Sequence, residues 1–214
     1  MKKTLFALLS ALIIAPVLWA QAQPGQFTAP KAFSEAPLSI FPSIDKMTRL
    51  DMIDYFNSGS PKPSKNMFKG DCRILSADDS QITISTSEIS NVEMSLIPLK
   101  TDTIVMVITT LKTPQEDSTV KFYRRNWEEL IPSPFAMPEL SDWMLPQAKQ
   151  HKDDIENMVP FILARITYNT STATLTLKNN TAESLPEEAE WAMPLLRDSI
   201  NFNWNGKKMV KAKE

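Results

Sequence analysis

The segment EMSLIPLKTDTIVMVITTLK, residues Glu93–Lys112, decides how the rest of the chain is interpreted. In its core, Ile104–Thr109, apolar residues occupy both alternating positions, which is typical of a strand buried on both faces. A weaker copy, EWAMPLLRDSINFNW, occupies Glu190–Trp204. Both segments carry glutamate, then proline, a basic residue and Asp-Thr/Ser-Ile. We therefore predict an α+β fold in which two related helix-plus-antiparallel-sheet halves are packed in tandem.

Further short matches extend the similarity between the two halves in the same order. They are Asn66-Met67 with Asn157-Met158, Arg73-Ile74 with Arg165-Ile166, and Ile82-Thr83-Ile84 with Leu175-Thr176-Leu177. A spacing of roughly 90 residues is typical of a duplicated domain rather than a solenoid. The alternative is that any two antiparallel hairpins align once gaps are allowed. We place the first half at residues 38–130 and the second at 131–214, with a proline-rich junction at 131–138.

The N-terminal residues predict an export signal. Lys2 and Lys3 precede an apolar run from Leu5 to Trp19, and Ala20-Gln21-Ala22 is a small-x-small cleavage site. We therefore assign residues 1–22 to a signal peptide that is cleaved after Ala22, and residues 23–37 to an extended lead-in. The alternative is a retained anchor, but the run is shorter than the roughly 20 apolar residues of a spanning helix. We expect a mature periplasmic or extracellular protein with no membrane span.

Composition excludes several classes of protein. Without the two signal lysines, the chain has 21 basic and 25 acidic residues, and its sequence contains no extended cluster of basic residues. Nucleic acid is therefore not an expected partner. A single cysteine cannot close an internal disulfide, and one cysteine with one histidine cannot form a Cys/His zinc set. Only four glycines are present, which excludes a clustered phosphate-binding loop. We predict no cofactor and no metal.

The clearest helical pattern follows the lead-in. Its apolar stripe consists of Ile44, Met47, Leu50, Ile53 and Phe56, with Ser43 as the predicted N-cap and Asn57-Ser58-Gly59 as the stop. Strands are predicted at 72–75, 81–86, 92–99, 102–111, 120–123, 161–167 and 173–177. Helices are predicted at 139–157, interrupted at Pro146, and from a capping box at Ser184–Glu187 to about Leu196. The chain closes with a hairpin whose two-residue turn is Asn205-Gly206.

No residue pattern predicts a catalytic site. Cys72 aligns with Ala164, which favours a buried structural thiol, and His151 lies among polar residues typical of a solvated helix face. The adjacent acid pairs are typical of solvated turns and helix ends: Asp78-Asp79, Glu116-Asp117, Glu128-Glu129, Asp153-Asp154 and Glu187-Glu188. Asp117-Ser118 is interpreted as a turn that caps the next strand. An enzyme is therefore the less favoured class, although a hydrolase with two opposed carboxylates stays open.

Binding is the more natural interpretation of the last strand. Asn201, Asn203 and Asn205 alternate with apolar residues, so they line one sheet face. Together with a nearby tryptophan, this face would suit a sugar or a peptide; the candidates are Trp127, Trp143 and Trp191. The alternative is that these asparagines lie on the ordinary solvent-exposed face of an antiparallel sheet and bind nothing. We predict a non-enzymatic envelope protein that binds a protein or peptide through a sheet face, with a carbohydrate-binding module as the alternative.

Several segments together resemble an uncharacterised family of exported proteins from Bacteroidetes-type bacteria, domain of unknown function 3256. The residues that carry the resemblance are Arg49-Leu50-Asp51-Met52, Asp54-Tyr55, Thr110, Pro114, Asp117-Ser118, Phe122-Tyr123, Trp127 and Trp204-Asn205-Gly206. The resemblance covers nearly all of the mature chain. It implies an exported envelope protein and brings no catalytic residues, because the family has no assigned activity. The doubled helix-and-meander pattern also resembles the tandem architecture of the β-lactamase inhibitory protein, which implies protein binding only by analogy of fold.

Overall fold

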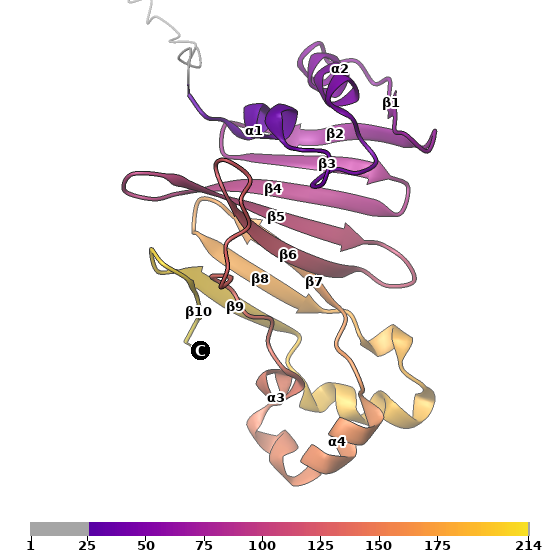
Figure 1. Ribbon diagram of the computed structural model, residues 1–214. Coiled ribbons are helices and arrows are strands. Elements are labelled where there is room, and N and C mark those ends of the chain that lie inside the picture. The colour runs from indigo at the N-terminus through magenta and orange to yellow at the C-terminus, as the bar shows by residue number, and fades with distance from the viewer. Residues whose placement is uncertain (1–25, 214) are drawn as a thin grey trace, which may run out of the picture.

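The computed structural model describes residues 26–213, which form two antiparallel sheets with helices around them (Figure 1). The helices are α1 (Ala29–Glu35), α2 (Lys46–Asn57), α3 (Leu140–Trp143), α4 (Lys152–Met158) and the 3-10 helices η1 (Pro146–His151), η2 (Ala182–Ser184) and η3 (Glu187–Leu195). The strands are β1 (Ser64–Lys65), β2 (Asp71–Ala77), β3 (Gln81–Ser87), β4 (Ser90–Pro98), β5 (Thr103–Leu111), β6 (Asp117–Arg124), β7 (Ala164–Asn169), β8 (Thr174–Asn179), β9 (Ser199–Trp204) and β10 (Met209–Lys211). The predicted signal peptide lies outside the described residues.

Each sheet is formed by one continuous part of the chain. Sheet 1 has the strand order β1-β2-β3-β4-β5-β6, and sheet 2 has the order β10-β9-β8-β7. Helices α1 and α2 precede sheet 1, and α3, η1 and α4 precede sheet 2. The predicted α+β class with two sheet-containing halves is therefore confirmed. The halves also differ, because sheet 1 has six strands and sheet 2 has four. In the first half, β4 lies between β3 and β5 and pairs with both, whereas in the second half η3 separates β8 from β9 in sequence and these two strands pair directly.

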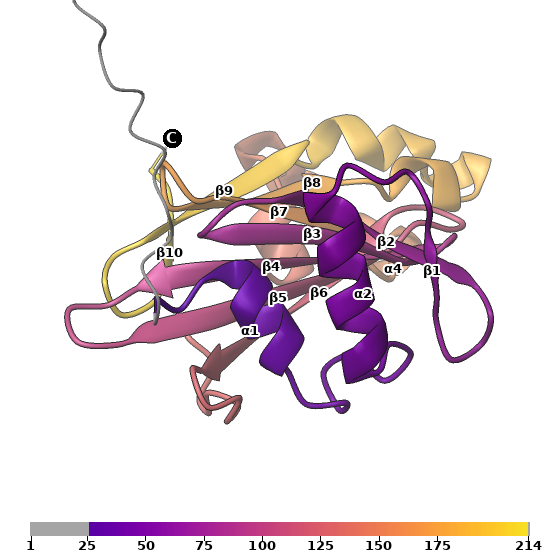
Figure 2. The same ribbon diagram turned by 90° about the horizontal axis from the view of Figure 1, so that it is seen from above.

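Strand β5 is buried on both faces, as its composition predicts. Val105 and Val107 contact the core that α1 and α2 cover, whereas Ile104, Met106 and Ile108 contact the core shared with sheet 2. Figure 2 shows α1 and α2 on the opposite side of sheet 1 from β8 and β9. Sheet 1 is thus the middle layer of the molecule, and both cores depend on it.

The buried face of α2 is not the predicted apolar stripe. Arg49 and Met52 are buried, whereas Met47 and Leu50 are exposed. The Arg49 guanidinium is held inside because it donates to the backbone oxygens of Ile44 and Ala36 at 2.9 and 2.5 Å. An arginine with two carbonyl acceptors can occupy a core position, which a hydrophobicity pattern does not anticipate. The predicted N-cap is also wrong, because Asp45 accepts the capping bond from the Thr48 N–H at 2.9 Å.

The predicted extended lead-in contains a helix instead. Helix α1 begins after Thr28, whose hydroxyl accepts a bond from the Lys31 N–H at 3.4 Å. Pro30 lies in its first turn, where a proline is tolerated because the N–H there lacks an intrahelical acceptor. The spaced prolines of this segment predict extended chain, and this prediction is wrong for residues 29–35. Ala32 and Phe33 are fully buried, so tertiary packing against sheet 1 stabilises this short helix.

Sheet 2 is joined to sheet 1 along the free edge of β7. Side chains of sheet 1 accept the outward N–H groups of alternating β7 residues: Asp117 from Ala164 at 3.0 Å, Ser118 from Ile166 at 3.0 Å, and Glu93 from Tyr168 at 3.1 Å. These three bonds satisfy a strand edge that would otherwise be unpaired inside the protein. Asp117 and Ser118 are therefore capping residues, as expected in kind. They lie within β6, however, and cap β7 of the other half rather than the strand predicted at 120–123.

Two local predictions in the second half are corrected. Helix η3 begins after Pro186 without a side-chain cap, so the predicted capping box does not form. The closing hairpin connects Trp204 to Met209 through four residues rather than two, and Asn205 accepts bonds from the N–H groups of Lys207 and Lys208 at 3.0 Å each. Between residues 26 and 213, no helix is long and apolar enough to cross a membrane.

Candidate functional site

The tryptophans predicted to flank the asparagine face lie elsewhere. Asn201 and Asn203 do lie on the outer face of sheet 2, where they accept bonds from Thr176 and Thr174 at 2.7 and 3.0 Å. Trp143 of α3 is buried in the core to which both sheets contribute, Trp127 packs on Tyr123 on the helix-bearing side of sheet 1, and Trp191 packs on His151. The asparagine face therefore has none of the expected aromatic platforms, and the argument for a sugar groove there loses its basis.

Cys72 and His151 are not brought together. Cys72 is fully buried in the core below α1 and α2, and its Sγ lies 3.5 Å from the Ser64 carbonyl oxygen. Burial raises the pKa of its thiol to about 11, and the nearby Asp71 carboxylate adds to the shift. His151 contacts Trp191 in the helical region of the second half, with ring centroids 5.7 Å apart. The expected burial of Cys72 is confirmed, and its high pKa disfavours the thiolate that nucleophilic chemistry requires.

Glu93 is a carboxyl group in an unusual environment, because it lies at the junction of the two sheets. Burial raises its pKa above the ordinary value, against the opposing effects of the Tyr168 N–H and the Arg165 charge. It lines a cavity of about 50 Å³ together with Glu116, which pairs with Arg165 at 3.0 Å. A cavity of this size holds one or two water molecules, and a sugar ring does not fit. This acid pair therefore favours a structural role over the hydrolase alternative.

Replacing Glu93 with glutamine is expected to stabilise the protein at neutral pH. Because folding raises the pKa of Glu93, its stabilising contribution is present below the ordinary value of 4.5 and is lost as the pH rises through the raised value. Glutamine keeps an oxygen that accepts the Tyr168 N–H but carries no buried charge. Urea titrations at several pH values should show E93Q above wild type at pH 7, with the gap closing in acid. A constant gap across the pH range would contradict this assignment.

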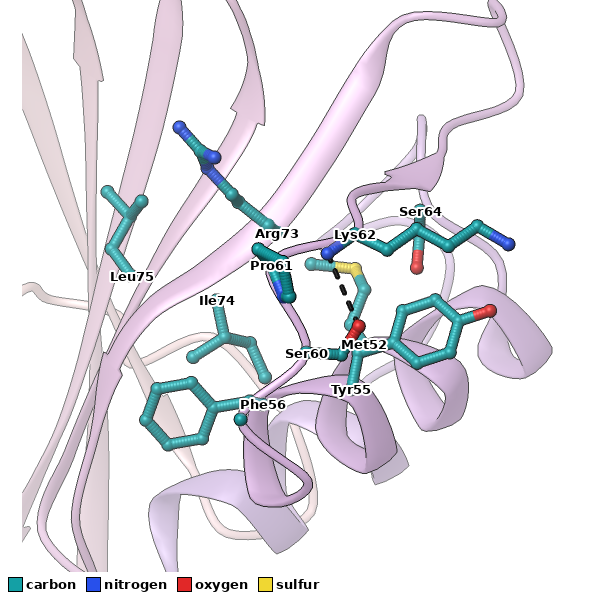
Figure 3. A pocket seen from close by; sticks show the side chains of 11 residues that line it. Met52, Tyr55, Phe56, Ser60, Pro61, Lys62, Ser64, Arg73, Ile74 and Leu75 are labelled. Atoms are coloured by element: carbon teal, nitrogen blue, oxygen red, sulfur yellow. Dashed lines mark hydrogen bonds between the residues drawn. The ribbon is translucent and has the colours of Figure 1, made fainter.

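An open groove lies between α2 and the outer edge of sheet 1 (Figure 3). Its volume is about 370 Å³, within the range of ligand pockets. Met52, Tyr55 and Phe56 of α2 form one wall, and Figure 3 shows the Phe56 side chain lying close to Ile74 of β2. Residues 59–62 and Ser64, in and after the connection from α2 to β1, also line the groove. We call this the α2–β2 groove.

The opposite wall of the α2–β2 groove is a strand edge. Three consecutive residues of β2, Arg73–Leu75, line it. Successive side chains of a strand point to opposite faces, so three in a row can line one groove only where it reaches the backbone edge. Strand β1 pairs with β2 only at Asp71 and Cys72. Before β1, the chain contains Pro61 and Pro63, which have no N–H to donate. Beyond Cys72, β2 pairs with β3 on its other side, but no strand of residues 26–213 pairs with it on the edge that faces the groove.

The α2–β2 groove is also positively charged. Lys62 lies 5.7 Å from the centroid of the Tyr55 ring. No carboxylate of residues 26–213 lies within ion-pair distance of Lys62 or Arg73. Two cations beside an apolar cleft favour a ligand that combines an apolar group with a negative charge.

A second groove lies on the helix-bearing face of sheet 1 over β4–β6. It has a volume of about 390 Å³, and the segment Ser39–Ser43 forms one side. Thr109 and Lys121 lie on its floor, and Lys121 pairs with Glu129 at 3.2 Å. Its one lysine is thus neutralised within the protein, so this groove offers less for a charged ligand than the α2–β2 groove does.

Sequence reasoning did not find the α2–β2 groove. One signal was present, because two prolines in the loop Ser60-Pro61-Lys62-Pro63-Ser64 prevent regular pairing with a neighbouring strand. What the loop leaves unpaired depends on where β2 runs, and that is decided by tertiary packing. The predicted apolar stripe of α2 did include Phe56, but it assigned this residue to the core rather than to an open wall.

Comparison with known protein families identifies the family of this chain. The family described as "Protein of unknown function (DUF3256)" matches residues 22–209. The chain belongs to this family. The resemblance seen in the sequence is thus confirmed, and the DUF3256 match includes every residue of the α2–β2 groove. No curated protein matches the chain.

A solved structure is similar to this DUF3256 protein. It is described as "Structure of a domain of an uncharacterized protein from Porphyromonas gingivalis W83". The TM-score is 0.71 at 20% sequence identity, and the match covers 86% of this chain and 98% of that chain. Because the identity is low, this similarity shows the fold alone.

Proposed function

We propose that this DUF3256 protein is exported and binds an extended segment of a partner protein in the α2–β2 groove. The observation that carries the proposal is the unpaired edge of β2 next to an apolar wall. Export is supported by the predicted signal peptide, residues 1–22. The proposal keeps the expected protein or peptide partner and moves the contact from a sheet face to a sheet edge.

The groove suits an extended chain because β2 offers backbone donors and acceptors there. A peptide that runs along Arg73–Ala77 would add a strand to sheet 1, with main-chain bonds giving affinity. One apolar side chain of the peptide would then enter between Phe56 and Ile74. An acidic residue beside it would meet Lys62 and Arg73. The expected ligand is therefore an extended segment with an apolar residue and a neighbouring aspartate or glutamate.

A random peptide library displayed on phage provides the test. The purified mature protein should select sequences that pair an apolar with an acidic residue. Hydrogen exchange with a selected peptide should show slower exchange of those β2 backbone amides within 73–77 that face the free edge. These amides gain partners in strand addition, whereas the others already face β3. Replacing the acid of the peptide with its amide should weaken binding.

A matched pair of variants on α2 separates the groove from the rest of the helix. Phe56 lines the groove and is 36% exposed, whereas Leu50 lies outside it and is 38% exposed. F56S should weaken peptide binding roughly tenfold, as expected for an anchor position, while L50S should change it little. Equal effects of both variants, or selection of no peptide, would overturn the proposal. Binding on a glycan array instead would favour the carbohydrate module.

A further inference from the structure

At one end of sheet 1, two turns and the last residue of β5, just before a third turn, each present a large apolar side chain to solvent. The turns β1–β2, β3–β4 and β5–β6 lie at the same end because consecutive antiparallel strands alternate in direction (right-hand end in Figure 1). The exposed side chains there are Phe68 at 81%, Ile89 at 53% and Leu111 at 53%. We call these three residues the turn row. Isolated exposed apolar residues are ordinary, but a row on consecutive turns of one sheet end indicates a contact surface.

The turn row is held rigidly rather than left loose. Asn66 is buried, and its side-chain oxygen accepts the N–H groups of Phe68 and Gly70 at 3.0 and 2.9 Å. Its side-chain amide donates to the Thr86 carbonyl oxygen of β3 at 2.9 Å, which ties the first turn to the next hairpin. The protein therefore fixes the turn shape from inside while the phenylalanine at its tip makes little contact with the core. Packing does not explain an aromatic residue at that position.

The second and third turns are also tied to each other. The Lys112 N–H donates to the Ile89 carbonyl oxygen at 2.9 Å. Neighbouring strands lie about 4.8 Å apart, so turns two strands apart are roughly 10 Å apart and the row spans about 20 Å. Phe68 and Leu111 are each followed by a lysine, Lys69 and Lys112, while Glu88 precedes Ile89. The row thus carries separate apolar tips with two cations and one anion beside them.

We propose that the turn row is a membrane-surface contact. Phe68, Ile89 and Leu111 would enter the boundary between lipid headgroups and acyl chains, while Lys69 and Lys112 stay at the level of the phosphates. Polar side chains, among them Asp71, Arg73 and Glu88, line a hollow at this end of sheet 1, so lipid headgroups fit between the apolar tips. The contact is peripheral, and it lies on a different part of sheet 1 from the α2–β2 groove. Either site can therefore be tested without the other.

Liposome flotation with the mature protein tests this contact. Vesicles of equal parts phosphatidylethanolamine and phosphatidylglycerol should carry the wild-type protein upward. The triple variant F68S/I89S/L111S should bind the vesicles at least roughly tenfold more weakly than the wild type, because it no longer buries three apolar side chains in the membrane. Raising the salt concentration should weaken binding only slightly, since two lysines and one glutamate leave little net charge.

M137S is the matched control, because Met137 is 48% exposed and precedes α3 in the second half. It should float like the wild type. The proposal is overturned if wild-type protein stays unbound, or if the triple variant floats equally well. It is also overturned if sedimentation velocity shows that the turn row holds two copies of the chain together in place of lipid. Circular dichroism of the triple variant should match wild type, since the replaced side chains are more than half exposed.

Discussion

R49A is expected to lower the free energy of unfolding by roughly 2–5 kcal/mol. Arg49 is 2% exposed and donates to two backbone oxygens, one beyond the end of α1 and one before α2. Its guanidinium also lies 6.0 and 5.8 Å from the ring centroids of Phe33 and Phe41. Truncation would leave two buried carbonyl groups without donors and open a cavity beside two aromatic rings. Urea titration followed by circular dichroism measures the loss.

Arg124 is the control for this change. It is exposed and lies 3.8 Å from Glu128, so R124A should cost less than about 1 kcal/mol. R49K should fall between the two, because an ammonium group keeps a charge but lacks the planar fork that reaches both oxygens. Burial lowers the pKa of the Arg49 guanidinium, although the Asp45 charge opposes that shift. If R49A and R124A unfold at the same urea concentration, Arg49 does not hold the two helices together.

Removing two of the side chains that cap the β7 edge should lower the free energy of unfolding about as much as R49A does. The double variant D117A/S118A leaves the N–H groups of Ala164 and Ile166 without acceptors at the junction of the two sheets. Each lost acceptor for a buried donor costs about 1–3 kcal/mol, so the pair should cost roughly 2–5 kcal/mol. Hydrogen exchange should accelerate first at these two amides of β7.

T119A is the matched control for the seam, since Thr119 lies in the same strand with an exposed side chain. It should unfold like the wild type. The exchange of amides in β2, near the edge of sheet 1 that lies away from β6, should be unchanged in D117A/S118A unless the whole molecule unfolds. Normal stability of the double variant would show that the Asp117 and Ser118 caps contribute nothing to holding the sheets together.

Much of the strand arrangement could be predicted because alternation and turn chemistry are local properties. The core of β5 shows its burial in its own composition, and β2 and β3 begin close to where their patterns predict. The repeated Asp-Thr/Ser-Ile motif correctly marks the starts of β5 and β9. The predicted helix before Leu196 also forms, although as a 3-10 helix.

The errors share one cause: the residues that contact a side chain in the folded protein are often far from it in the sequence. Arg49 looks polar in the sequence and becomes part of the core because two carbonyl oxygens reach it from other segments. Ser118 looks like a turn residue and becomes the cap of a strand 48 positions away. The α2–β2 groove exists because a proline-containing loop runs beside a strand that it does not pair with.

By itself, the sequence determined the α+β class, the two-sided burial of β5, the buried thiol at Cys72 and the family, because each follows from residue types at short, regular spacing. Tertiary structure alone decided which face of α2 turns inward, how side chains of one half cap the β7 edge of the other, and where an unpaired edge remains. The physical reason is that a buried polar group is stable only when its donors or acceptors are satisfied. Those partners come from segments that only folding brings together.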